Sequence, residues 1–142
     1  MKEVKLTTPE QPCFIGAWYL PDISLCDEII NTYNTNAFRT APGTIGPKTE
    51  NIIDTKVKDS IDSTLYDVPN LANKFTSNLL TVLEQYKKNF PVINEVDSFF
   101  LDSLNIQKYS KGAGYYAWHS ERMGANFRHL VWMTYLNDIA EG

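Results

Sequence analysis

The stretch GAGYYAWHSERMGANFRHLVWMTYLND, residues 112–138, contains both histidines of the chain. His119 stands two residues before Glu121, and alternate residues of a β-strand point to the same side of a sheet. Both side chains can therefore reach one metal ion. An imidazole and a carboxylate belong to the ligand set of the facial triad that holds non-haem Fe(II). Taken alone the pair is a weak signal, because a histidine and an acid at this spacing also arise by chance in a half-exposed polar strand.

The whole chain has the composition of one globular domain. Its 142 residues are 43% hydrophobic and 13% aromatic, which is enough for a sizeable core. Thirteen basic and seventeen acidic residues give a net charge of −4, which disfavours a nucleic-acid or membrane-surface partner. The apolar runs are too short to cross a bilayer, and the N-terminus lacks the apolar part of a signal peptide. We therefore expect a cytoplasmic protein with free thiols at Cys13 and Cys26.

The pattern of residues 13–89 predicts one strand and two helices, with a polar stretch between the helices. Residues 13–20, CFIGAWYL, are rich in aromatic and apolar side chains, which is typical of a strand. Residues 23–33 carry apolar side chains at helical spacing, with Ser24 as the expected N-cap. A second amphipathic helix is predicted over residues 70–89.

The other segments predict a loop and three further strands. Residues 34–63 are polar and contain several glycines and prolines, which indicates a long loop with one or two short strands, a candidate flap over a site. Residues 104–109 and 115–121 alternate in character with period two, as half-buried strands do. Residues 127–136 are apolar on both faces, which is typical of a strand covered on both sides. Helices followed by successive antiparallel strands predict an α+β domain.

The residues around His119 resemble the prolyl-4-hydroxylase-like branch of the 2-oxoglutarate- and Fe(II)-dependent dioxygenases. In that family a strand ends in tyrosine, a glycine-bearing turn follows, and a tyrosine precedes a His-x-acid pair. A later strand ends in a Tyr-Leu-Asn-like sequence. The same elements stand here in order: Tyr109, Gly112 and Gly114, Tyr115 or Tyr116, His119 and Glu121, then Tyr135-Leu136-Asn137. The opening stretch, residues 12–30, is also similar to the start of such chains.

The resemblance implies a fold and an activity. The fold would be a double-stranded β-helix, the jelly-roll core of cupin-like proteins, within a single domain over residues 1–142. Residues 1–97 would form the N-terminal helical support, and residues 98–142 the first jelly-roll strands. The implied activity is that of an oxidoreductase that hydroxylates a C–H bond, as prolyl 4-hydroxylases do on a peptide or protein. Fe(II) would be the metal and 2-oxoglutarate the co-substrate, with ascorbate as a candidate reductant.

The resemblance also assigns roles to individual residues. His119 and Glu121 would be two of the three iron ligands. Tyr109 and Tyr135 would line the 2-oxoglutarate pocket, where their hydroxyls would bind carboxylate oxygens. Arg128 would shape the cavity or contact substrate, although a regular strand places positions 128 and 135 on opposite faces.

The chain departs from the family pattern in two respects. Glu121 stands where the branch most often has aspartate. The family's third ligand, a histidine far downstream, and the basic residue that pairs with 2-oxoglutarate have no counterpart before Gly142, so we expect a C-terminally truncated and incomplete jelly roll. His129 is an unfavoured substitute for the third ligand, because a strand histidine usually packs or hydrogen-bonds within its sheet. Missing strands would leave an open sheet edge, which predicts self-association through residues 127–136.

Two other functions stay open. One is a catalytically silent binding or structural module on the same jelly-roll scaffold, because a fold does not determine a function. The other is an α+β carbohydrate- or peptide-binding domain with an aromatic platform that includes Trp118 and Trp132. The platform requires exposed tryptophans, whereas the dioxygenase hypothesis places them in the packing of the sheet.

Overall fold

The structure is a computed structural model that describes residues 2–6, 14–46, 50–121 and 128–139. Within these residues two α-helices accompany a small three-stranded antiparallel sheet, which confirms the mixed helix-and-strand class. In chain order the elements are α1 (Ser24–Asn34), β1 (Ala41–Pro42), β2 (Ile61–Thr64), η1 (Leu65–Asp67), α2 (Pro69–Asn89), η2 (Pro91–Glu95) and β3 (Asn105–Lys108).

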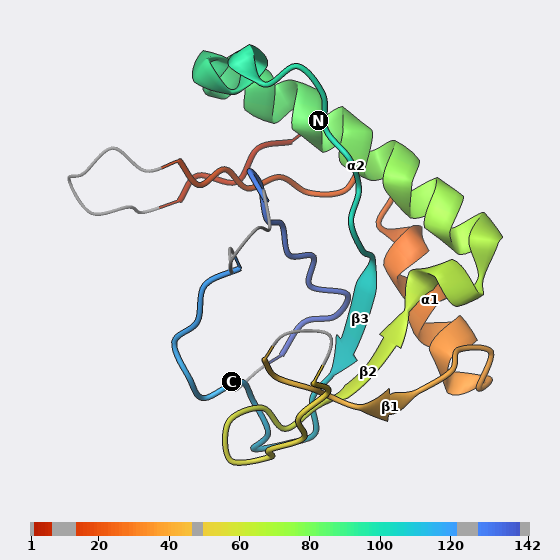
Figure 1. Ribbon diagram of the computed structural model, residues 1–142. Helices are drawn as coiled ribbons and strands as arrows, with labels where there is room; N and C mark the ends of the chain where they lie inside the picture. Colours follow the sequence, from red (N-terminus) through yellow and green to blue (C-terminus); the bar gives the residue numbers. More distant parts are fainter. Residues whose placement is uncertain (1, 7–13, 47–49, 122–127, 140–142) are drawn as a thin grey trace.

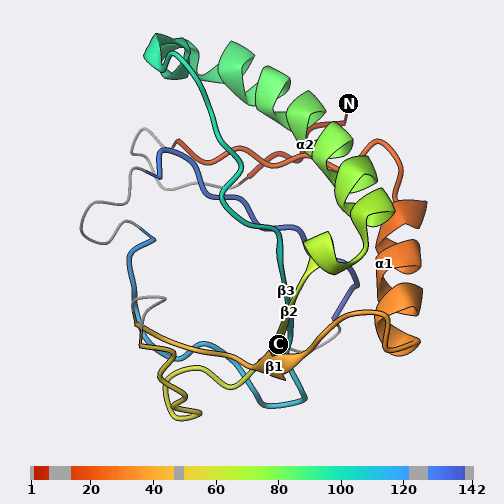
Figure 2. The same cartoon turned by 45° about the vertical axis from the view of Figure 1, so that its right-hand side comes forward.

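The sheet has the strand order β1-β2-β3. β2 pairs with β3 along its whole length, with Ser63 opposite Ile106. β1 contributes only a short pairing at the other edge of β2, where Pro42 is tolerated because an edge strand can lack one N–H donor. Both α-helices lie on the same side of this sheet in Figure 1 and Figure 2.

The hydrophobic core lies where the two helices meet the sheet. α1 buries Leu25 and Ile29, which stand one helical turn apart and so share a face. α2 buries a longer stripe on the face that packs toward α1 and η1. The complete buried cluster is Leu25, Ile29, Phe38, Leu65, Leu71, Ala72, Phe75, Leu79 and Leu104. Because full burial of one large aliphatic side chain contributes roughly 1.5–3 kcal/mol, this helical layer supplies most of the apolar stabilisation in the described residues.

Both predicted helices are confirmed, and α1 differs from the prediction in how it begins. Ile23 occupies the N-cap position in place of Ser24 and makes no side-chain capping hydrogen bond. Asp22 instead accepts hydrogen bonds from the Ser24 hydroxyl at 2.7 Å and from the Ser24 backbone N–H at 3.0 Å. These bonds lower the pKa of the Asp22 carboxyl. Within the described residues, no helix combines the length and the apolar character that a membrane crossing needs.

The predicted strand over residues 13–20 is wrong in its described part. Trp18 forms one isolated antiparallel bridge with Glu3, and no regular strand is present over residues 14–20. Two backbone hydrogen bonds flank this bridge, from the Val4 N–H to the Ala17 carbonyl at 2.8 Å and from the Tyr19 N–H to the Lys2 carbonyl at 3.0 Å, and the described residues extend the ladder no further. Cys13 lies outside the described residues, and Cys26 is a partly buried free thiol.

The two C-terminal strands are also wrong within the described residues. In residues 115–121 only Tyr115 forms a bridge, which it makes with Lys58. Residues 128–136 contain no strand and expose most of their apolar side chains, and Phe127 lies outside the described residues. A period-two pattern becomes a strand only where a second backbone satisfies its N–H and C=O groups, and β3 forms the edge of the described sheet.

The stretch over residues 34–63 contains the short strands that the sequence predicts, namely β1, the start of β2 and one isolated bridge. Its last part differs from a loosely attached flap, because Lys58 and Ser60 are buried. β3 confirms the strand predicted over residues 104–109. Leu104 is buried before it and Asn105 is exposed at its start, as the alternation predicts.

The chain after β3 extends away from the helices and then returns. Residues 115–121, drawn in light blue in Figure 1, run on the side of the sheet that faces away from α1 and α2 in both views. Residues 128–139 come back toward β3, where Leu136 packs against the core cluster. We call residues 115–121 the motif segment, because they carry His119 and Glu121.

Candidate functional site

Two backbone hydrogen bonds attach the start of the motif segment to the chain before β2. The Asp59 N–H donates to the Gly114 carbonyl at 2.9 Å, and the Tyr116 N–H donates to the Val57 carbonyl at 2.8 Å. These bonds flank the bridge between Lys58 and Tyr115. They attach the start of the motif segment to residues 57–59, although the segment itself is not a strand.

The residue between these two hydrogen bonds, Lys58, is a buried lysine. Lys58 is only 5% exposed, and its Nζ lies 2.5 Å from Asp62 Oδ2. The other Asp62 oxygen accepts a hydrogen bond from the Ser60 hydroxyl at 2.7 Å. The Lys58 ammonium also lies 5.9 Å from the centre of the Tyr115 ring, within reach of a cation–π interaction. A buried ammonium needs such partners, because an unpaired charge in the interior carries a large desolvation penalty.

Tyr115 connects this buried group to His119. The two rings stack with their centroids 4.1 Å apart and their planes 5° from parallel. His119 Nδ1 lies 3.2 Å from the Ala117 carbonyl oxygen. His119 Nε2 lies 3.3 Å from Glu121 Oε1, and both side chains are 42% exposed. The structure therefore brings together the two predicted metal ligands in an accessible position.

The contacts of His119 fit either a proton or a metal ion between its Nε2 and Glu121. The Ala117 carbonyl can only accept, so this contact is satisfied when Nδ1 carries the proton. A neutral imidazole then presents the lone pair of Nε2 to a carboxylate oxygen, which also presents lone pairs. That contact is favourable when a proton or a metal ion lies between the two atoms. Two ligands at a right angle, each about 2.1 Å from one octahedral ion, lie roughly 3 Å apart.

Arg128 holds the second oxygen of Glu121. Its Nη1 donates to Glu121 Oε2 at 2.8 Å, and its Nε donates to Asp102 Oδ2 at 3.0 Å, with a further bond from Nη2 to the same oxygen. The hydrogen bond with Asp102 and the charges of both carboxylates raise the pKa of Arg128, so the guanidinium stays charged. Arg128 was expected to shape the cavity or contact substrate, and here it pairs with one of the predicted metal ligands.

The other predicted residues make contacts of their own. Burial, followed by the negative charge of Asp62, raises the pKa of Tyr109, whose hydroxyl donates to Gln107 Oε1 at 3.2 Å. The Tyr135 side chain is 78% exposed, and His129 is exposed as well. In the described part of the chain, no hydrogen bond, ion pair or ring contact joins Tyr135 or His129 to the His119–Glu121 pair. The roles of these residues stay predictions.

The donor types at this site fit part of an iron-binding triad. His119 supplies an imidazole nitrogen and Glu121 a carboxylate oxygen, which are the donor types of the facial triad. Among the described residues, no group of three or more histidine, cysteine, aspartate or glutamate side chains could hold a metal ion. The third ligand is therefore not assigned.

Sequence reasoning missed two residues that support the site. Lys58 falls in a stretch predicted as loop, and its spacing to Asp62 is the one a helical ion pair would use, so it gave no signal for a sheet. Asp102 precedes β3 and meets Arg128 across 26 residues of sequence. No local pattern indicates a contact at that separation.

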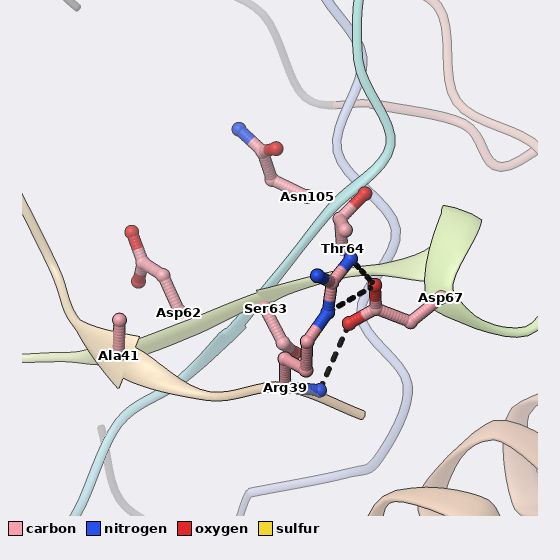
Figure 3. A pocket seen from close by; sticks show the side chains of 7 residues that line it. All are labelled: Arg39, Ala41, Asp62, Ser63, Thr64, Asp67 and Asn105. Carbon is pink, nitrogen blue, oxygen red and sulfur yellow. Dashed lines mark hydrogen bonds and ion pairs between the residues drawn. The ribbon is translucent and has the colours of Figure 1, made fainter. Parts of the chain in front are cut away.

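A second candidate site is an open hollow of about 400 Å³ over the strands (Figure 3). Its lining residues are Arg39, Ala41, Asp62, Ser63, Thr64, Asp67 and Asn105. Asp67 accepts three hydrogen bonds from Arg39, from the backbone N–H at 2.8 Å, Nε at 3.1 Å and Nη2 at 2.7 Å. These bonds lower the pKa of Asp67. The two charges satisfy each other, which indicates a structural pair rather than a ligand site.

Aromatic exposure differs from what the dioxygenase hypothesis predicts. Trp118 in the motif segment is fully exposed, and Trp132 is partly exposed. The expectation that these tryptophans pack in the sheet is therefore wrong, and this observation favours the aromatic-platform alternative.

Comparison of the chain with known protein families, curated proteins and solved structures finds no match. Similarity to a characterised protein therefore assigns neither a family nor an activity. The residues of the candidate site and the contacts that hold them are what bears on function.

Proposed function

We propose that the chain is an Fe(II)- and 2-oxoglutarate-dependent dioxygenase that hydroxylates a C–H bond, with a peptide or protein substrate of the prolyl-hydroxylase type. The observation that carries the proposal is the 3.3 Å approach of His119 Nε2 to Glu121 Oε1 at an accessible position. A ligand histidine commonly donates its other ring N–H to a carbonyl or carboxylate, and His119 has such a carbonyl in Ala117. The jelly-roll topology is part of the same proposal.

Each residue of the site would have its own role in this reaction. His119 and Glu121 would hold the iron, and Tyr109, which lies near Tyr115, would hydrogen-bond a carboxylate of 2-oxoglutarate. The iron, when bound, supplies the centre at which O2 oxidises 2-oxoglutarate to succinate and CO2 while one oxygen atom enters the substrate C–H bond. The stacked Tyr115 ring shields one face of His119 from water. Ascorbate would serve as an auxiliary reductant.

Anaerobic titration of Fe(II) and 2-oxoglutarate tests this function. We expect a charge-transfer absorbance band that saturates near about one equivalent of iron, as one facial-triad site requires. His119→Ala and Glu121→Gln should abolish the band because each removes one ligand. His129→Ala serves as the matched control and should keep it. A wild-type protein that gives no saturable band would contradict the proposal.

Turnover separates the enzyme from the catalytically silent jelly-roll module. An active dioxygenase releases succinate from 2-oxoglutarate when O2 is admitted, and proline-containing peptides should increase that release. A protein that binds iron and 2-oxoglutarate but releases no succinate under these conditions would instead be the binding or structural module.

The exposed tryptophan supports a second candidate function, carbohydrate or peptide binding on an aromatic platform. Trp118 is fully exposed and its neighbour Tyr116 is exposed too, whereas tryptophan is buried in most positions of folded proteins. Quenching or shift of tryptophan fluorescence by oligosaccharides or proline-rich peptides, lost in Trp118→Ala, would support this function. An unchanged emission spectrum across such ligands would count against it.

Self-association is part of the proposal as well. Residues 128–139 expose several large apolar side chains, namely Val131, Trp132, Met133, Tyr135 and Ile139. Exposed apolar clusters favour contact with another chain. Sedimentation analysis at increasing concentration should therefore detect association, and a monomer at every concentration would contradict it.

A further inference from the structure

One arginine connects the His119–Glu121 pair to the edge of the sheet. Arg128 donates to Glu121 on one side and to Asp102, just before β3, on the other. The Glu121 side chain is exposed on a segment that has no strand structure, so the backbone of the segment does not by itself fix the carboxylate. Arg128 is only 24% exposed in its side chain, and its planar guanidinium offers donors in a fixed geometry.

We propose that Arg128, anchored by Asp102, is a positioning residue that holds Glu121 with Oε1 directed at His119. This inference rests on the proposed function, because it assigns Arg128 to the same metal site. Arg128 Nη1 engages Glu121 Oε2, and the other oxygen, Oε1, faces the imidazole. Groups that orient a metal ligand in this way typically change metal affinity by 10–100-fold when they are removed.

The Asp102 carboxylate is essential to this arrangement because of charge. A lone guanidinium next to Glu121 would repel a divalent cation and would weaken binding. Asp102 accepts hydrogen bonds from the same guanidinium, so the Arg128–Asp102 pair contributes little net charge. The pair therefore supplies a hydrogen-bond donor to Glu121 without the repulsion that an unpaired arginine would cause.

A second arginine–aspartate pair in the chain provides a matched control. Arg39 donates to Asp67 through its side chain and its backbone N–H, and the pair lies over the sheet (Figure 3). Within the described residues, no hydrogen bond or ion pair joins it to His119 or Glu121. Both pairs join an arginine to an aspartate that is distant in sequence. Only the Arg128–Asp102 pair reaches a predicted metal ligand.

The test compares charge-balanced double variants by their affinity for Mn(II), measured from the electron paramagnetic resonance signal of the free ion. Arg128→Gln/Asp102→Asn removes the Arg128–Asp102 ion pair and keeps the net charge. We expect this double variant to bind Mn(II) about 10–100-fold more weakly than wild type. Arg39→Gln/Asp67→Asn makes the same chemical change elsewhere and should leave Mn(II) affinity unchanged. Arg128→Lys keeps the charge but loses the planar donor geometry that bridges the two carboxylates, so it should recover only part of the affinity.

Each outcome decides the inference. Wild-type Mn(II) affinity in Arg128→Gln/Asp102→Asn would overturn the positioning role and leave the proposed function intact. Absence of Mn(II) binding in the wild-type protein would overturn both. If circular dichroism shows that the double variant does not fold, Asp102→Asn alone decides, because it leaves Arg128 unanchored and uncompensated; weaker Mn(II) binding is expected, and unchanged binding would overturn the inference.

Discussion

The helical layer and the motif segment are held in place by different kinds of contact. Helices α1 and α2 satisfy their backbone hydrogen bonds internally and bury apolar stripes, with Ile29 and Leu71 almost fully enclosed. The motif segment has no ladder of its own and depends on two backbone bonds, the stack of Tyr115 on His119, and Arg128. Packing thus stabilises one region, and a few polar contacts position the other.

If the proposed function holds, this difference separates the residues that stabilise the fold from those that bind the ligand. Changes in the helical layer should alter the free energy of unfolding, because apolar burial is concentrated there. Changes in the motif segment should alter ligand binding and leave stability nearly unchanged, because its side chains are largely exposed. Variants in each region test this contrast.

Leu71→Ala should give the largest loss of stability. Leu71 is almost completely buried in the α2 face of the core, so its truncation removes apolar burial and leaves a cavity, at a cost of about 3 kcal/mol. Leu80→Ala on the same helix is the control, since Leu80 is exposed and its truncation should change stability by less than about 0.5 kcal/mol. Urea unfolding measures both. Equal losses in the two variants would contradict the assignment of the core.

Asp62→Asn should give an intermediate loss beneath the motif segment. The substitution leaves the buried Lys58 ammonium without its carboxylate partner. We expect this to destabilise the fold by about 2 kcal/mol, less than for a fully buried pair, because the Asp62 side chain is 25% exposed. Lys58→Met removes the charge together with the need for a partner and should therefore cost less. Thermal unfolding of both variants gives the comparison. A larger loss in Lys58→Met would show that the ion pair itself stabilises the fold.

The Arg39–Asp67 pair should give the smallest effect, visible in acid. Arg39 lowers the folded-state pKa of Asp67 below its ordinary value of 3.8. Stability from this pair is therefore fully present above about pH 4 and is lost as the pH falls through the lowered pKa. Asp67→Asn should flatten the decline in stability below about pH 4, and Arg39→Gln should flatten it in the same way. If the free energy of unfolding declined at low pH in both variants as it does in wild type, the result would contradict the pairing.

The sequence predicted the parts of the fold that depend on local patterns. The apolar spacing in α1 and α2 identified both helices, because a helix satisfies its own backbone. The strands predicted around Trp18, His119 and Trp132 were wrong, because a strand requires a partner backbone that no local pattern supplies. β3 was correct because β2 lies beside it.

The candidate site shows the same division. The spacing of His119 and Glu121 predicted that the two side chains meet, and they do, although through a stacked and irregular segment rather than through a strand. The contact of Arg128 with Asp102 spans 26 residues and depends on how the chain returns to β3. Contacts of this kind follow from the fold and not from local sequence.

The most direct test of the central claim is an anomalous-scattering measurement on crystals grown without oxygen in the presence of Mn(II) and 2-oxoglutarate. We expect a manganese peak bonded to both His119 Nε2 and Glu121 Oε1, at about 2.0–2.2 Å from each atom. Glu121 Oε2 should stay hydrogen-bonded to Arg128 in the same crystals. Manganese bound only elsewhere, with His119 and Glu121 still paired directly to each other, would contradict the claim that these residues form a metal site.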